Sequence, residues 1–171
     1  TQAGAASLHR RAFETIEPGD VLVIDARGDM GARVTGDILA TRLKYRGAAG
    51  LVTDGAIGDL AAMQTVGLPV YSRGLTPVTF GELHVMADLN VPISCAGVLV
   101  MPGDILVADP EGVMVIPQAI AAEVAEAGVE GERKDAFSRS KVEAGHPLAE
   151  AYPLNEKLQA EYDATKARPR T

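Results

Sequence analysis

The chain has 171 residues, of which 47% are hydrophobic and 23% charged, a balance typical of a globular domain with an ordinary core. Its formal charge of −7, with only three Phe, four Tyr and no Trp, argues against binding to nucleic acid, because phosphates need Lys and Arg and single strands need aromatic platforms. The single cysteine, Cys95, excludes an internal disulfide, and no apolar run reaches the roughly 18 residues of a membrane helix, so we expect a cytoplasmic protein with no membrane contact.

The first half of the chain predicts alternating strands and helices. Apolar runs predict three buried strands, at residues 21–24, 51–53 and 69–72. Between them lie two predicted helices, at residues 36–45 and 59–66. Thr35 is expected to cap the first helix, and Ile38 to share its buried face with Leu39 and Leu43. The strand–helix–strand–helix–strand order predicts parallel pairing with right-handed crossovers.

The second half is predicted to be hairpin-rich and then helical. Short apolar segments joined by tight turns predict antiparallel strands, at residues 91–100, 105–108 and 113–116. From Gln118 onward the spacing is helical, and the tripeptide Gly145-His146-Pro147 interrupts it. We expect the polar tail from residue 153 to pack on a neighbouring subunit or to fray. We therefore predict one α/β domain at residues 1–145 and a C-terminal helical tail at residues 146–171.

The sequence contains one short internal echo. Residues 18–25 read PGDVLVID, and residues 102–109 read PGDILVAD. Two copies of a turn-plus-strand unit are too few for a solenoid. They indicate either pseudo-symmetric halves of one sheet or barrel, or coincidence.

The first candidate site is the start of the first predicted helix. It is formed by the backbone amides of Gly36, Asp37, Ile38 and Leu39. Amides at a helix N-terminus, with the helix dipole behind them, bind carboxylate or phosphate, and Gly36 has no Cβ to block a close approach. The alternative is a strand-to-helix loop with good capping. The glycine spacing matches neither the phosphate-binding nor the dinucleotide-binding motif.

The second candidate site follows the second predicted strand, where α/β sheets place their ligands. Asp54 and Asp59 lie on either side of a short glycine-containing loop, and carboxylates near a turn suit Mg²⁺ or Mn²⁺. The alternative makes Asp54 a turn residue and Asp59 a helix cap. Because both candidate loops follow the carboxyl ends of neighbouring strands, we expect them to converge in space.

The order of several motifs resembles that of a known family. The resemblance lies in the stretches GDMGARVTGDILATRLKYRGAAGLVTDGAIGD, PVYSRG and VPISCAGVLVMPGDILVADPEGVMVIP. They are similar to the RraA-like family, which contains the regulator of ribonuclease activity A and the 4-hydroxy-4-methyl-2-oxoglutarate aldolases. The resemblance runs from roughly residue 18 to residue 117, and HPLAEAYPLNE resembles the C-termini of longer members. Family members usually carry a further N-terminal segment, which we expect this chain to lack.

The resemblance implies a fold and an assembly. The fold is α/β, a swivelling-type β/β/α sandwich with a mixed sheet, flanking helices, a hairpin-rich second half and C-terminal helices. The assembly is a homotrimer or homohexamer with an active site between subunits. In the aldolase members, amides matching Gly36 to Leu39 hold the pyruvoyl group, an aspartate matching Asp59 binds Mg²⁺ or Mn²⁺, and an acidic catalytic residue matching Asp37 supports the metal's water shell.

Two activities follow from the resemblance. One is a metal-dependent lyase of the class II pyruvate aldolase type, which cleaves 2-oxoacids such as 4-hydroxy-4-methyl-2-oxoglutarate or decarboxylates oxaloacetate to pyruvate. The alternative is a non-catalytic, regulator-like protein that docks on an RNA-processing enzyme. Retention of Asp59 and of the GDIL turn favours the enzyme.

Two positions depart from the aldolase pattern and favour the regulator. The aldolases carry arginine at the substrate-binding position occupied here by Gly58, and an acidic residue where this chain has Ala62. Loss of a charged donor from such a site typically lowers the rate by roughly 10² to 10³. Two other arginines, Arg33 and Arg73, are candidates to replace the missing cation.

Overall fold

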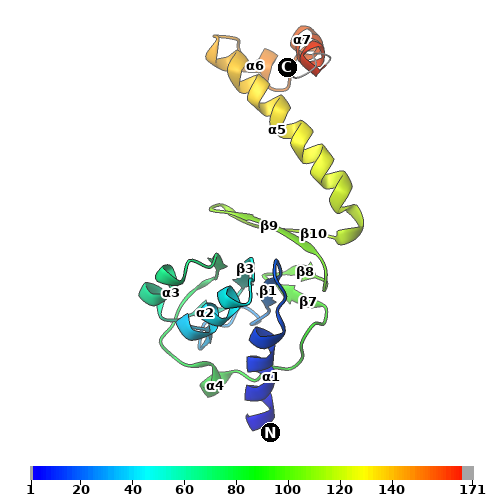
Figure 1. Ribbon diagram of the computed structural model, residues 1–171. Helices are drawn as coiled ribbons and strands as arrows, with labels where there is room; N and C mark the ends of the chain where they lie inside the picture. The colour runs from blue at the N-terminus through cyan, green and yellow to red at the C-terminus, as the bar shows by residue number, and fades with distance from the viewer. Residues whose placement is uncertain (1, 167–171) are drawn as a thin grey trace. The chain divides into compact units, whose positions relative to one another are not determined.

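The computed structural model describes residues 2–166, and their side chains from residue 8 onward. The chain forms two units, one running to Gln118 and the other beginning at Ala119. The boundary predicted at residue 145 falls within the second unit, at the turn after its long helix. Each unit is described by itself (Figure 1).

The first unit contains two short parallel sheets. One has the strand order β1-β3-β5, formed by β1 (Val21–Ile24), β3 (Gly50–Thr53) and β5 (Val70–Tyr71). The other has the order β2-β4-β6, formed by β2 (Arg33–Thr35), β4 (Ala56–Ile57) and β6 (Gly74–Leu75). Each strand of the first sheet is thus followed along the chain by a strand of the second.

Two antiparallel hairpins and four helices complete this unit. The hairpins are β7 (Ile93–Cys95) with β8 (Val98–Val100), and β9 (Ile105–Asp109) with β10 (Gly112–Ile116). The helices are α1 (Gln2–Thr15), α2 (Asp37–Tyr45), α3 (Leu60–Val66) and α4 (Phe80–Leu83). The predicted α/β class, the parallel β1-β3-β5 pairing and the hairpin-rich second half are therefore confirmed.

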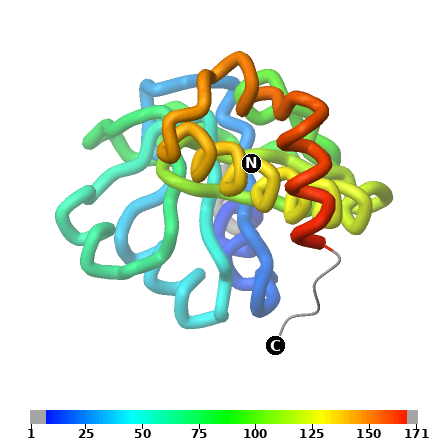
Figure 2. The backbone as a smooth tube through the Cα atoms, turned by 90° about the horizontal axis from the view of Figure 1, so that it is seen from above, coloured from blue at the N-terminus to red at the C-terminus, as the bar shows by residue number. Residues whose placement is uncertain are grey.

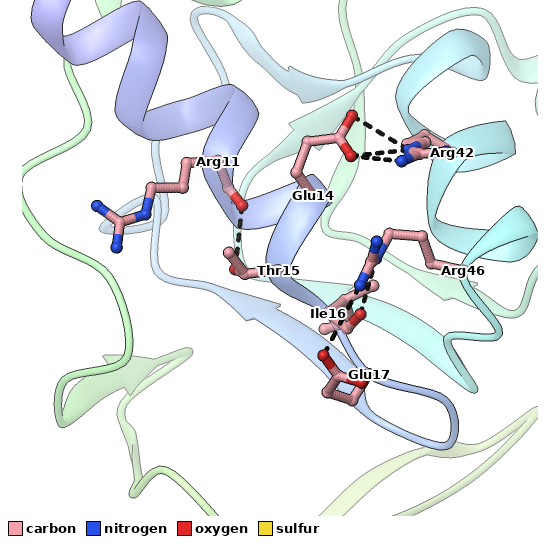
Figure 3. Close-up of polar contacts among 7 residues, drawn as sticks. All are labelled: Arg11, Glu14, Thr15, Ile16, Glu17, Arg42 and Arg46. Atoms are coloured by element: carbon pink, nitrogen blue, oxygen red, sulfur yellow. Dashed lines mark hydrogen bonds and ion pairs between the residues drawn. The ribbon is translucent and has the colours of Figure 1, made fainter.

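The hydrophobic core lies between the first sheet and helices α1, α2 and α3. Phe13, Leu43 and Leu51 are at most 1% exposed and form its centre. Figure 3 shows the polar contacts between α1 and α2. Arg42 of α2 forms an ion pair with Glu14 of α1, with 2.5 Å between Nη2 and Oε2. Arg46 Nε donates to the Ile16 carbonyl oxygen at 2.9 Å. These contacts join α2 to α1 and to the residue that follows α1.

Two details of the α2 prediction are wrong. Thr35 does not cap the helix, because it lies inside β2, is 2% exposed, and points its hydroxyl at the Gly36 carbonyl oxygen. Gly36 is the N-cap instead. Ile38 does not face the core but is 80% exposed. Ala40 and Leu43 form the buried face, and at about 100° per residue Ile38 lies on the opposite side from Ala40.

The internal echo encodes a turn and not a repeated sheet. In both copies the amide of the aspartate donates three residues back, from Asp20 to Glu17 O and from Asp104 to Met101 O. In both copies the aspartate carboxylate accepts the amide of that earlier residue. The following strands then differ, because β1 pairs in parallel with β3 whereas β9 forms an antiparallel hairpin. The two copies are therefore not pseudo-symmetric halves of one sheet.

The second unit is a long helix with two shorter ones. It begins with a 3₁₀ turn (Gln118–Ile120) and α5 (Ala121–Glu143), followed by α6 (Leu148–Ala151) and α7 (Glu156–Lys166). Helix α7 runs beside α5 (Figures 1 and 2), with Lys141 bonded to Glu161 at 2.5 Å and Phe137 packed on Tyr162. Over residues 156–166 the tail thus packs on its own chain and does not fray. None of the helices described is long and apolar enough to cross a membrane.

Asp54 ties three loops of the first unit together. Its buried carboxylate accepts the amides of Ala26 at 2.7 Å, Gly28 at 2.9 Å and Ala96 at 3.2 Å. Three amides satisfy both carboxylate oxygens, so Asp54 acts as a structural acceptor and the turn interpretation of this residue is the correct one.

We predict that Asp54→Asn destabilises the fold by about 2–4 kcal/mol, because the new amide group faces backbone N–H donors and leaves at least one of them unpaired in the interior. Urea unfolding measures this loss. Asp109→Asn is the control: its carboxylate also accepts two backbone amides, but it is exposed, so we expect less than about 1 kcal/mol. Equal losses for the two variants would contradict the role given to Asp54.

Candidate functional site

The two candidate loops converge, as the strand order predicts. Asp59 lies at the N-cap of α3 with φ 56° and ψ 38°, and its side chain does not cap that helix. The carboxylate instead lies against Gly36 at the start of α2. A Cβ at Gly36 would overlap Asp59 Oδ2 and lie 3.4 Å from Asp59 Cγ. The close approach of the Asp59 carboxylate to the α2 terminus therefore requires glycine at position 36.

Arg33 occupies the space left by a second glycine. Its Nη1 donates to Asp59 Oδ1 at 2.6 Å. The arginine side chain passes directly over Gly58, where a Cβ would overlap Arg33 Cδ and Nη1 and lie 3.1 Å from Cζ. The other candidate cation, Arg73, is directed elsewhere, because its Nη1 donates to the Gly28 carbonyl oxygen at 3.0 Å. Of the two arginines, only Arg33 contacts Asp59.

Both charged groups line an open hollow. Its volume is about 390 Å³, and its lining residues are Arg33, Ile57, Gly58, Asp59, Leu60, Leu75, Thr76 and Pro77. The Arg33 and Asp59 side chains are 25% and 35% exposed, so water reaches the ion pair. The hollow thus offers one cation and one carboxylate in front of a largely apolar wall.

The first turn of α2 is partly occupied by its own side chain. Asp37 Oδ1 accepts the Ile38 amide at 2.8 Å, and the Thr41 hydroxyl donates to the Asp37 carbonyl oxygen. The Asp37 carboxylate therefore accepts the Ile38 N–H that an incoming substrate carboxylate would otherwise accept. Its predicted roles in supporting a metal's water shell and in catalysis stay predictions.

Two histidines hold the segment that carries Arg33. His9 Nε2 lies 2.9 Å from the Val34 carbonyl oxygen, and its ring stacks on Phe80 with 3.9 Å between centroids. His84 Nε2 lies 3.0 Å from the Ala32 carbonyl oxygen. Because no metal-ligand spacing relates these two histidines, their joint role could not be inferred from the sequence.

Burial lowers the pKa of His9 below its ordinary value of 6.5, although the bond to Val34 acts in the opposite direction. His9 is therefore neutral at physiological pH and donates one ring hydrogen to the carbonyl group of the strand that carries Arg33. The α1 helix thereby supports the site through a single imidazole.

The donor set fits a hard divalent cation held by a single protein carboxylate. Among residues 2–166 no group of three or more His, Cys, Asp or Glu side chains gathers as a metal cluster. Mg²⁺ is commonly held by one or two carboxylates, with water and substrate oxygens completing its shell. Asp59, exposed in the hollow, can serve as such a ligand once Arg33 releases it.

The first unit is an α/β fold, and its hollow brings one arginine and one aspartate together beside strands β2, β4 and β6. The profile of the RraA-like family, described as Aldolase/RraA, matches residues 1–115. The chain belongs to this family. All residues of the hollow lie within the matched part.

Relatives carry two kinds of name. The chain is 43% identical over 108 residues to a Halalkalibacterium halodurans protein named "Putative 4-hydroxy-4-methyl-2-oxoglutarate aldolase", covering 63% of this chain and 51% of that protein. An Ectopseudomonas mendocina protein of the same name is 36% identical, covering 67% and 70%. The crystal structure of Streptomyces coelicolor RraAS2, described as an unusual member of the RNase ES inhibitor RraA protein family, has a TM-score of 0.74 and 35% identity, covering 77% and 67%. The chain thus spans about half the length of the first of these relatives.

We predict that acid destabilises the protein partly through His9. Because the pKa of His9 is lower in the folded state, its contribution to stability is complete above pH 6.5 and is lost as the pH falls from 6.5 through the folded-state pKa. His9→Gln removes this titration, so the urea midpoint of the variant should fall less than that of the wild type between pH 7.5 and 5.5. An unchanged pH dependence in His9→Gln would contradict the assignment.

Proposed function

We propose that this protein is a divalent-metal-dependent lyase of the class II pyruvate aldolase type, which cleaves small 2-oxoacids such as 4-hydroxy-4-methyl-2-oxoglutarate or decarboxylates oxaloacetate to pyruvate. The observation that carries the proposal is the position of the Asp59 carboxylate, against Gly36 at the start of α2 and open to the hollow. A 2-oxoacid needs a cation beside its oxo group and donors for its carboxylate. Asp59 would hold the cation, and the amides at the first turn of α2, which the Asp59 carboxylate approaches at Gly36, would supply the donors.

The chain's own residues supply binding and orientation. Backbone amides at the first turn of α2, at Gly36, Asp37, Ile38 and Leu39, are suited to the substrate carboxylate, which would displace the Asp37 side chain from the Ile38 amide. Asp59 would hold Mg²⁺ or Mn²⁺, which when bound polarises the 2-oxo group and stabilises the developing enolate. The apolar wall at Leu60, Leu75 and Pro77 limits access of water to one side of the substrate.

The comparisons support the aldolase class of this proposal. Relatives in two bacteria carry the aldolase name, and the family match covers the whole hollow. The hollow is open on one side, which supports completion by a second copy of the chain in a homotrimer or homohexamer. We expect such an enzyme of small metabolites to act in the cytoplasm and to have no nucleic-acid or membrane partner.

We predict that the purified protein releases pyruvate from oxaloacetate or 4-hydroxy-4-methyl-2-oxoglutarate with Mg²⁺ or Mn²⁺, and that EDTA abolishes the release. A coupled lactate dehydrogenase assay measures it, with metal alone as the blank because free divalent ions decarboxylate oxaloacetate slowly. Asp59→Asn should lower kcat/KM by roughly 10² to 10³, since it removes the charge that holds the cation. Asp109→Asn, outside the hollow, should leave it unchanged. Absence of turnover above the blank with both substrates would refute the proposal.

The second candidate is a regulator-like protein that docks on an RNA-processing enzyme. The resemblance to the Streptomyces protein supports it, and so does glycine at position 58. Calorimetry with Mg²⁺ and oxalate separates the two, because a docking protein has no reason to bind either. Absence of binding, together with absence of turnover, would favour this candidate.

A further inference from the structure

The hollow contains an arginine side chain, that of Arg33, although this chain has glycine at position 58, where the aldolases carry arginine. The side chain of Arg33 crosses over Gly58 from the neighbouring strand β2. Its Cδ, Nη1 and Cζ occupy the space where a side chain at residue 58 would begin. The Arg33 side chain can therefore take this path only because Gly58 has no Cβ.

We propose that Arg33 is the substrate-binding cation of this site and binds the anionic oxygens of the 2-oxoacid; this inference rests on the function proposed above. Arg33 is the one cationic side chain among the described residues that line the hollow, because the other lining residues are neutral apart from Asp59. A guanidinium is suited to this task, since its planar fork matches adjacent carboxylate and oxo oxygens.

Arg33 is held in a way that permits exchange of partners. It pairs with Asp59 through Nη1, and both side chains remain partly exposed. Partly exposed ion pairs hold their partners weakly, because water and salt screen the attraction. If Asp59 held a divalent cation, the guanidinium would lose its counter-ion and be repelled by the new charge, so it would be free to accept a substrate anion.

This exchange gives Arg33 two opposite effects. In the free protein it competes with the metal for Asp59, whereas in the complex it attracts the substrate. Substitution of a residue that merely supports the fold would weaken the binding of both the metal and the substrate. The direction of the two effects therefore distinguishes binding by Arg33 from a structural role.

The test measures binding of Mg²⁺ alone and of oxalate in the presence of Mg²⁺ by calorimetry. Oxalate is a stable dianion that resembles the enolate of pyruvate. Arg33→Gln should weaken oxalate binding roughly 10- to 100-fold, the usual range for a charge-assisted hydrogen bond, while Mg²⁺ alone binds equally well or more tightly. Arg33→Lys should restore part of the oxalate affinity. Arg73→Gln is the matched control and should stay within about twofold of the wild type for both ligands.

Two variants at position 58 test the route of the side chain. Gly58→Ala keeps Arg33 but adds a Cβ that overlaps it, so oxalate affinity should fall as in Arg33→Gln. The double variant R33G/G58R moves the arginine to the neighbouring strand and should recover oxalate binding. Gly58 is not in the left-handed region, so its backbone accepts an arginine.

The outcomes separate this inference from the proposed function. Unchanged oxalate affinity in Arg33→Gln or in Gly58→Ala would overturn the inference, and so would parallel losses of Mg²⁺ and oxalate affinity with a lowered melting temperature. Failure of the wild-type protein to bind oxalate with Mg²⁺ would also overturn it. Arg33-dependent oxalate binding without any turnover would leave the inference standing and refute the lyase instead.

Discussion

The site depends on the register between two short parallel strands. Arg33 of β2 pairs with Ala56 of β4, and Thr35 pairs with Ile57. The next residues, Gly36 and Gly58, follow side by side, with the Gly58 amide donating to the Thr35 carbonyl oxygen at 3.0 Å. Because neither glycine has a Cβ, the Asp59 carboxylate can lie against one backbone and the Arg33 guanidinium can cross the other. A shift of one residue would put side chains where these charged groups now meet.

Much of the fold could be predicted because its first sheet is encoded by continuous apolar runs. The strands at Val21–Ile24 and Gly50–Thr53 consist of buried and half-buried residues, and their continuous apolar runs make them recognisable in the sequence. The sheet β2-β4-β6 could not be predicted, since strands of two or three residues have no periodicity to detect. The predicted burial of Ile38 was wrong because several apolar residues of α2 could have formed its buried face. In the structure that face is formed by Ala40 and Leu43.

The site was predictable only to the level of its loops. We expected the Asp59 loop to converge with the α2 terminus because both loops follow neighbouring parallel strands. The strands that join them in the structure are β2 and β4, which the sequence analysis did not include. The choice between Asp54 and Asp59 needed coordinates, because it depends on which carboxylate the backbone amides already satisfy. The choice between Arg33 and Arg73 also needed coordinates. The path of the Arg33 side chain to Asp59 depends on the missing Cβ of Gly58, whereas Arg73 donates to the Gly28 carbonyl oxygen.

We propose that the Asp59 carboxylate and the amides at the first turn of α2 form a single binding site. The most direct measurement is a crystal structure of the protein with Mn²⁺ and oxalate, using the anomalous signal to locate the metal. We expect the manganese peak on the carboxylate of Asp59, with an oxalate oxygen on the metal and others facing the first turn of α2. Manganese bound elsewhere, or oxalate bound away from residues 36–39, would contradict the account.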